Sequence, residues 1–118
     1  MTPEQVRDTI VAGLEEAKAQ DIKVMDVSGL TNVTDFMILA TGTSSRHVLA
    51  IADNLVDYMK DHGHRPLCVE GQEEAERVLV DLNDAIVHIM HADARVFYDL
   101  DQLWGEELRQ IVEKNREN

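Results

Sequence analysis

The sequence predicts a single α/β domain in which helices flank a mixed five-stranded sheet. Apolar residues recur at helical spacing in two long segments, and five short apolar runs bounded by turn residues predict strands. The predicted order is helix, strand, strand, helix, strand, strand, strand, helix, which mixes both kinds of element along the chain. With 118 residues, of which 44% are apolar and 29% charged, the chain suffices for one hydrophobic core.

The first helix is predicted to begin at Thr2-Pro-Glu-Gln5. Threonine is a good N-cap, proline suits the first helical position, and glutamine three residues after the cap completes a capping box. We expect this helix to end near Gln20, with an apolar stripe formed by Val6, Ile10, Leu14 and Ala17. Ile22–Val27 is then predicted to be a short strand that a Ser-Gly turn closes.

The next unit is a strand, a loop and a helix. Asp35–Thr41 is apolar on both faces, which is typical of a strand inside a sheet that helices cover. A glycine and hydroxyl loop, Thr41–His47, leads into a second helix that should end at His62-Gly63, because glycine is a common helix stop. The apolar stripe of this helix consists of Val48, Ile51, Leu55 and Met59.

Three further strands and a helix complete the predicted fold. Pro66–Val69 is a short strand, with proline at its first position, where no ladder donor is lost. Val78–Leu82 and Ala85–His91 are predicted to form a tight hairpin, in which Asn83 tolerates a positive φ. Gly105–Asn115 is predicted to be a short C-terminal helix.

The net charge limits the classes of partner. The chain carries 23 acids and 11 bases, a formal charge of -12, so direct binding to nucleic acid is not expected. Eleven of the acids but only two bases, Arg77 and Arg95, lie between Glu70 and Glu107. This stretch could attract a basic protein partner, although acidic surfaces also serve solubility alone.

The single cysteine excludes an internal disulfide and fits a reducing compartment. Because Leu67 and Val69 flank Cys68, we expect a buried strand residue and no nucleophile. No basic and apolar leader opens the chain, and no apolar run approaches the ~18 residues of a membrane span. We therefore predict a cytoplasmic protein that contacts no membrane.

The loop before the second helix is a candidate anion site. Gly42, Thr43 and Ser44 precede the helix start, where unpaired N–H groups and the helix dipole favour phosphate. The loop lacks the lysine of a Walker phosphate loop and the acidic pair that nucleotidyltransferases place nearby to hold metal ions. Ser44 and Ser45 are better explained as helix caps, and we predict no catalytic residue and no cofactor.

The five histidines show no metal-binding spacing, so no metal site is predicted. His62 and His64 should be solvated in a turn, and His88 should be a hydrogen-bonded structural residue inside a strand. His47 could act as a general base only if a nucleophile lay beside it.

Aromatic and acidic residues alternate after the last predicted strand. Tyr98 and Leu100, which lie among carboxylates, would make a sensible protein-binding patch, since aromatic side chains supply much of the energy at interfaces. From the residues alone, a core position is equally compatible with this pattern.

Six blocks stand in order along the chain: Asp26-Val-Ser-Gly, Thr31-Asn-Val-Thr-Asp-Phe, Thr41-Gly-Thr-Ser-Ser-Arg-His, Glu70-Gly, Val80-Asp-Leu-Asn-Asp-Ala-Ile-Val-His-Ile-Met and Phe97-Tyr-Asp-Leu-Asp-Gln-Leu-Trp104. Together they closely resemble the ribosomal silencing factor family, also called the Iojap-like family, roughly from Val6 to Trp104. The resemblance implies a nucleotidyltransferase-like fold without known enzymatic activity. It also implies binding to protein fourteen of the large ribosomal subunit, a block on subunit joining that lowers translation in starvation, and a role in large-subunit assembly.

Carried over by position, the resemblance implies a partner-binding surface formed by Arg77, Asp81, Leu82, Asp84, Tyr98, Asp99, Leu100 and Asp101. Arg77 departs from the pattern, because many relatives have tryptophan there, and Asn83 replaces a common glycine. A guanidinium could weaken the contact or replace apolar burial by a salt bridge.

Two other hypotheses remain open from the sequence. The chain could be a nucleotide- or phosphate-binding protein, or a degenerate nucleotidyltransferase, that uses Thr41–His47. It could be a monomer, or a homodimer whose interface uses the aromatic patch.

Overall fold

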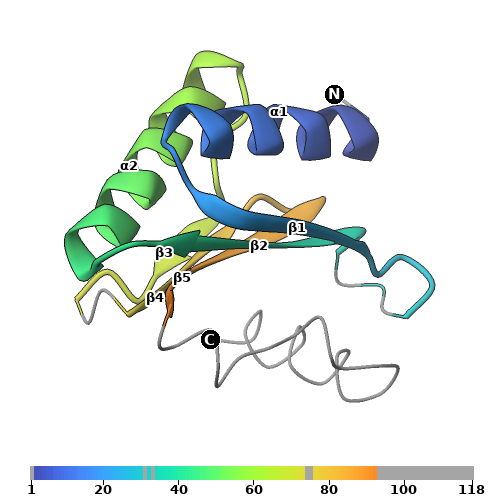
Figure 1. Ribbon diagram of the computed structural model, residues 1–118. Helices are drawn as coiled ribbons and strands as arrows, with labels where there is room; N and C mark the ends of the chain where they lie inside the picture. Colours follow the sequence, from blue (N-terminus) through green and yellow to red (C-terminus); the bar gives the residue numbers. More distant parts are fainter. Residues whose placement is uncertain (1, 31, 33, 74–75, 93–118) are drawn as a thin grey trace.

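The computed structural model describes residues 2–30, 32, 34–73 and 76–92. Two helices and five strands follow one another in these residues (Figure 1). Their bounds are α1 Pro3–Glu16, β1 Gln20–Asp26, β2 Phe36–Gly42, α2 Ser45–Asp61, β3 Cys68–Glu70, β4 Arg77–Asp81 and β5 Ala85–His91. The predicted helix at Gly105–Asn115 lies outside the described residues.

The five strands form one mixed sheet in the order β1-β2-β5-β4-β3. β2 and β5 are parallel, and the other three neighbouring pairs are antiparallel. This confirms the predicted α/β class and the mixed sheet. Both described helices lie on one face of the sheet, which they cover (Figure 1).

Both helices begin and end with local motifs. The Thr2 side chain accepts the N–H of Gln5 at 3.2 Å, and the Gln5 side chain accepts the N–H of Thr2 at 2.9 Å, so the predicted capping box is confirmed. At the end of α2, Gly63 has φ +77, and the N–H of His64 donates to the carbonyl of Met59 at 2.8 Å. This pattern is a Schellman motif with the expected glycine.

The end of α1 differs from the prediction. The helix stops at Glu16 instead of Gln20, because Lys18 adopts φ +63. The N–H of Lys18 donates to Glu15 and the N–H of Ala19 donates to Leu14, both at 3.0 Å. These bonds form the same Schellman motif with lysine at the glycine position. No glycine marked this stop in the sequence, so the prediction ran too far.

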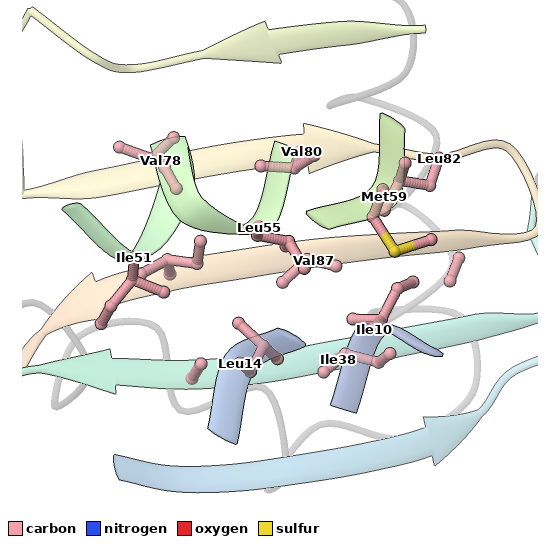
Figure 2. Packing of buried hydrophobic residues seen from close by; sticks show 14 of the residues in the cluster. Ile10, Leu14, Ile38, Ile51, Leu55, Met59, Val78, Val80, Leu82 and Val87 are labelled. Atoms are coloured by element: carbon pink, nitrogen blue, oxygen red, sulfur yellow. The ribbon is translucent and has the colours of Figure 1, made fainter. Parts of the chain in front are cut away.

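Alternate residues of the strands point to opposite faces of the sheet. The face under the helices packs against both helices in one large apolar cluster, in which Ile10, Leu14, Ile51, Leu55 and Met59 meet Ile38, Val78, Val80, Leu82 and Val87 (Figure 2). The opposite face carries a smaller buried cluster of Val27, Met37, Leu39, Leu79, Ile86 and Met90. Every residue of β2 is buried, as its apolar sequence predicted.

The strands at the two edges of the sheet are less buried. In β1 the register shifts between Gln20 and Lys23, and Asp21 has φ +47. Cys68 lies in the short edge strand β3, but it is exposed, so the predicted burial was wrong. The same local sequence is compatible with a buried strand inside the sheet and with an edge strand that has one solvated side. Only the strand order, which places β3 at the edge, distinguishes the two.

The β4–β5 hairpin has the predicted turn. Asn83 has φ +71, and its N–H donates to the Asp81 carboxylate at 2.9 Å. The carbonyl of Asp84 accepts the N–H groups of Asp35 and Phe36, each at 3.1 Å, which joins the turn to the start of β2.

Neither of the described helices is long and apolar enough to span a membrane.

Candidate functional site

Gly42 ends β2 where the chain enters the hydroxyl loop. A Cβ at this position would lie 2.8 Å from Val48 Cγ2 and 2.9 Å from the Val48 backbone nitrogen. Such distances are too short for a real contact, so the start of α2 can pack this closely on β2 only if residue 42 is glycine. The glycine therefore has a packing reason that requires no phosphate.

The hydroxyl loop satisfies several of its own donors. Ser44 is the N-cap of α2: its hydroxyl accepts the N–H of His47 at 3.1 Å, and its carbonyl accepts the N–H of Val48 at 2.9 Å. The predicted cap at Ser44 is confirmed, whereas Ser45 is the first helical residue. The N–H of Thr43 donates to Nδ1 of His47 at 2.9 Å. These donors are engaged within the loop, which leaves fewer for an anion.

His47 links the loop to the first helix. Its Nε2–H donates to the carbonyl of Ala17 at 3.1 Å, while its Nδ1 accepts the N–H of Thr43 at 2.9 Å. Ala17 is 30 residues away in the chain and caps the end of α1. His47 therefore acts as a structural connection between the two helices.

The other turn histidines are also bonded to the backbone. Nδ1–H of His62 donates to the Tyr58 carbonyl at 2.7 Å, and Nε2–H of His64 donates to the Leu82 carbonyl at 2.9 Å. His62 is exposed as predicted, but His64 is half-buried, because the chain turns back past the end of β4. Within the described residues, no group of three or more His, Cys, Asp or Glu side chains could hold a metal ion.

His88 is the most unusual polar residue among those described. It lies in the central strand β5, between Leu39 and Leu79 of the neighbouring strands, and its side chain is fully buried. In the described part of the chain neither ring nitrogen has a hydrogen-bond partner, so the predicted hydrogen-bonded role was wrong. Burial, and then the charge of Arg77, lower the pKa of His88 to about 3, so the ring is neutral.

Four of the predicted partner-binding residues lie on β4 or in the hairpin turn. Arg77 and Asp84 are half-buried, at opposite ends of this segment. Asp81 is only 2% exposed, and Leu82 is fully buried in the cluster under the helices. Arg77 and Asp84 are thus the accessible members of this group. The remaining four, Tyr98, Asp99, Leu100 and Asp101, lie outside the described residues.

One surface feature was not predicted from the sequence. A cleft of about 260 Å³ lies between α1 and α2, and its lining includes Gly13, Glu16, Asp57, Tyr58 and Asp61. Gly13 lies inside the first helix, four residues before Ala17, and a glycine at such a position could have indicated close helix packing.

Comparison with known proteins supports one family along the whole chain. The family model described as "Ribosomal silencing factor during starvation" matches residues 1–118. A ribosomal silencing factor from Haemophilus influenzae is 48% identical over 78% of this chain and 90% of its own. The mouse protein called mitochondrial assembly of ribosomal large subunit protein 1 is 30% identical, over 82% of this chain and 44% of its own. A crystal structure of a Chromobacterium violaceum protein superposes with a TM-score of 0.85 at 37% identity, covering 90% of this chain and 89% of that one.

Proposed function

The chain belongs to the ribosomal silencing factor family, and from this membership we propose that it binds the large ribosomal subunit and prevents the small subunit from joining. As a member of that family it is a non-enzymatic factor that represses translation during starvation. The family match over all 118 residues is the observation that carries the proposal. The name of the mouse relative, which refers to assembly of the large subunit, supports that subunit as the partner and a further role in its assembly.

The proposed mechanism is steric exclusion. A protein that occupies part of the subunit-joining surface blocks association by its volume, so no chemical step is required. We propose that occupancy alone determines the degree of repression.

The proposed contact is a protein, namely large-subunit protein fourteen. A net charge of -12 opposes binding to ribosomal RNA and favours docking on a basic protein surface. Arg77 and Asp84, which are partly accessible, would contribute together with Tyr98, Asp99, Leu100 and Asp101. Asp81 and Leu82 are buried and would support this surface from within.

Sedimentation with separated ribosomal subunits tests the proposal. The purified chain should co-sediment with large subunits and not with small ones, and it should reduce the formation of joined ribosomes. Failure to bind large subunits at both low and moderate salt would contradict it.

Two substitutions test the proposed anchors. Tyr98→Ala and Leu100→Ala should each weaken binding to large subunits by roughly tenfold, because truncation of an interface anchor typically costs 1–2 kcal/mol or more. Thermal unfolding serves as the control, since an unchanged Tm separates lost binding from lost folding. If both variants bind normally, the two residues do not belong to the interface.

A further inference from the structure

Gly71 follows β3 directly and has a backbone conformation that favours glycine. Its φ is +89, outside the extended range of the strand that it leaves. The residue is exposed, so packing in the core does not require a glycine here. Among the described residues the other glycine with positive φ is Gly63, which belongs to the Schellman motif that ends α2. Gly71 therefore needs a separate explanation.

The explanation lies in a close approach of two backbone segments. A Cβ at Gly71 would overlap the carbonyl oxygen of Arg77 and would lie 3.5 Å from the Cα of Val78. A backbone oxygen cannot rotate away as the end of a flexible side chain can, so a larger residue at position 71 would displace β4 at Arg77. A Cβ at Gly63, by contrast, would meet nothing within 4 Å beyond its chain neighbours.

The approach matters because Arg77 lies beyond the end of the ladder between β3 and β4. The pairing of these two strands in the described residues stops at Leu79, so it does not reach Arg77. On the other side Arg77 pairs with Met90 of β5. The backbone of Arg77 is therefore held between β5 and Gly71, and the glycine takes the place of a ladder partner on the β3 side.

Arg77 is also one of the accessible residues of the proposed ribosome contact. It is half-buried, and strand alternation puts it on the face of the sheet opposite the helices, because Val78 packs under them. An irregular backbone beside a strand commonly aims a side chain, as β-bulges do. We propose that Gly71 is a positioning residue for this contact: its close approach fixes the backbone of Arg77, and with it the direction from which the guanidinium reaches the large subunit.

This role rests on the proposed function, but the approach itself can be tested without ribosomes by nuclear magnetic resonance of the full chain. In the unchanged chain an Hα proton of Gly71 should give a nuclear Overhauser effect to the Hα of Val78, because the two residues are in contact. The Nε–H signal of Arg77, assigned with Arg77→Lys, should shift in Gly71→Ala and stay in place in Gly63→Ala. Absence of the Overhauser effect, or an Arg77 signal that does not move in Gly71→Ala, would overturn the proposal.

Two matched variants separate the close approach from the cost of a positive φ. Gly71→Ala and Gly63→Ala both place alanine where φ is positive, but only the first also puts a Cβ against a carbonyl. In co-sedimentation, Gly71→Ala should weaken binding to large subunits about fivefold, and Gly63→Ala less than about 1.5-fold. Binding is measured well below the Tm of each variant, so that both chains are folded.

A double variant shows whether Gly71 acts through Arg77. When Gly71→Ala is added to Arg77→Ala, binding should weaken by less than about 1.5-fold further, because the side chain that Gly71 positions is already absent. A glycine that only supported the fold would weaken binding by the same factor in both backgrounds. Gly71→Asn is the second variant: asparagine tolerates a positive φ but retains the Cβ, so it should weaken binding as alanine does.

Equal losses from Gly71→Ala with and without Arg77 would overturn the positioning role. Normal binding by both Gly71→Ala and Gly71→Asn would do the same, and the proposed function would then still stand because the unchanged chain binds. Failure of the unchanged chain to bind large subunits would instead remove the proposed function. The two resonance measurements contain no ribosomes, so they show separately whether Gly71 holds Arg77 in place.

Discussion

The two faces of the sheet are both buried, but their residues differ in kind. The face under α1 and α2 contributes only apolar side chains to one large cluster. The opposite face has a smaller apolar cluster, and the alternation of β2, β4 and β5 adds Thr41, Asp81 and His88 to it. Burying polar groups costs free energy unless they are paired. The helix side therefore contributes most of the stability, and on the opposite face the buried ring of His88, whose nitrogens have no hydrogen-bond partner among the described residues, carries such a cost.

The largest expected effect is on the helix side. Leu55→Ala should lower the free energy of unfolding by about 3 kcal/mol, since it leaves a cavity between α2 and the sheet. Urea unfolding followed by circular dichroism measures this change. Val56→Ala, at a half-buried neighbouring position, is the control and should cost about 1 kcal/mol or less. A loss of less than about 1 kcal/mol in Leu55→Ala would contradict the assignment of stability to this face.

The second prediction concerns His88 on the opposite face. Its pKa is about 3 in the folded chain and 6.5 in an ordinary environment, so the unfolded chain binds the extra proton first as the pH falls. Stability should be complete above pH 6.5 and should decrease towards pH 3. The loss attributable to His88 between pH 7 and pH 5 should be about 2 kcal/mol.

Urea midpoints at several pH values measure this dependence. Carboxylates also titrate at the lower end of the range, so His88→Leu is the matched control, because leucine fills a similar apolar site without a proton to gain. The variant should lose most of the decrease between pH 7 and pH 5. An identical decrease in both proteins would show that the His88 ring does not cause it.

The third prediction concerns binding to large ribosomal subunits, which should depend on the sheet face that carries Arg77 more than on the helix side. Arg77→Ala should weaken binding to large subunits by roughly threefold to tenfold, because Arg77 lies on the face proposed to dock there. Arg46→Ala removes the same charge from exposed surface in the first turn of α2 and should change binding less than about twofold. Co-sedimentation at a series of chain concentrations gives both values. A larger effect from Arg46 would place the interface on the helix side.

The smallest effect is expected at the hydroxyl loop. Calorimetric titration with nucleoside triphosphate and magnesium should give no binding heat at millimolar ligand, because Thr43 and His47 donate their N–H groups within the loop. Saturable heat would revive the nucleotide-binding hypothesis. Its loss in Thr43→Pro, which removes one of these N–H groups, would then identify the loop as the site.

Local motifs account for the parts of the fold that the sequence predicted well. The capping box of Thr2 and Gln5 involves residues three apart, and the turn at Asn83 depends on its own φ and on a bond to Asp81. The same holds for Gly63 at the end of α2. Interactions of this range are present in a short stretch of sequence. In the part of the chain that the structure describes, the element types were therefore correct and most bounds agreed within about two residues.

The candidate sites were harder to predict because they depend on distant contacts. The apolar neighbours of Cys68 indicated burial, but β3 lies at the edge of the sheet. His47 looked like a possible base until its ring was placed against Ala17, the cap of another helix. Gly42 looked like part of a phosphate loop, and its close approach to Val48 explains it instead.

The sequence alone determined the α/β class, the two helices with their stripes, the β4–β5 hairpin and the family resemblance, because each rests on residue type and short-range spacing. The tertiary structure decided which strands lie at the edges and that Leu82 and Asp81 are buried. It also decided that the ring nitrogens of His88 have no hydrogen-bond partner among the described residues. It also brought Gly13 and Tyr58 together across two helices to form the acidic cleft. These outcomes depend on how elements far apart in the chain pack, and packing is set by the whole core and by no single segment.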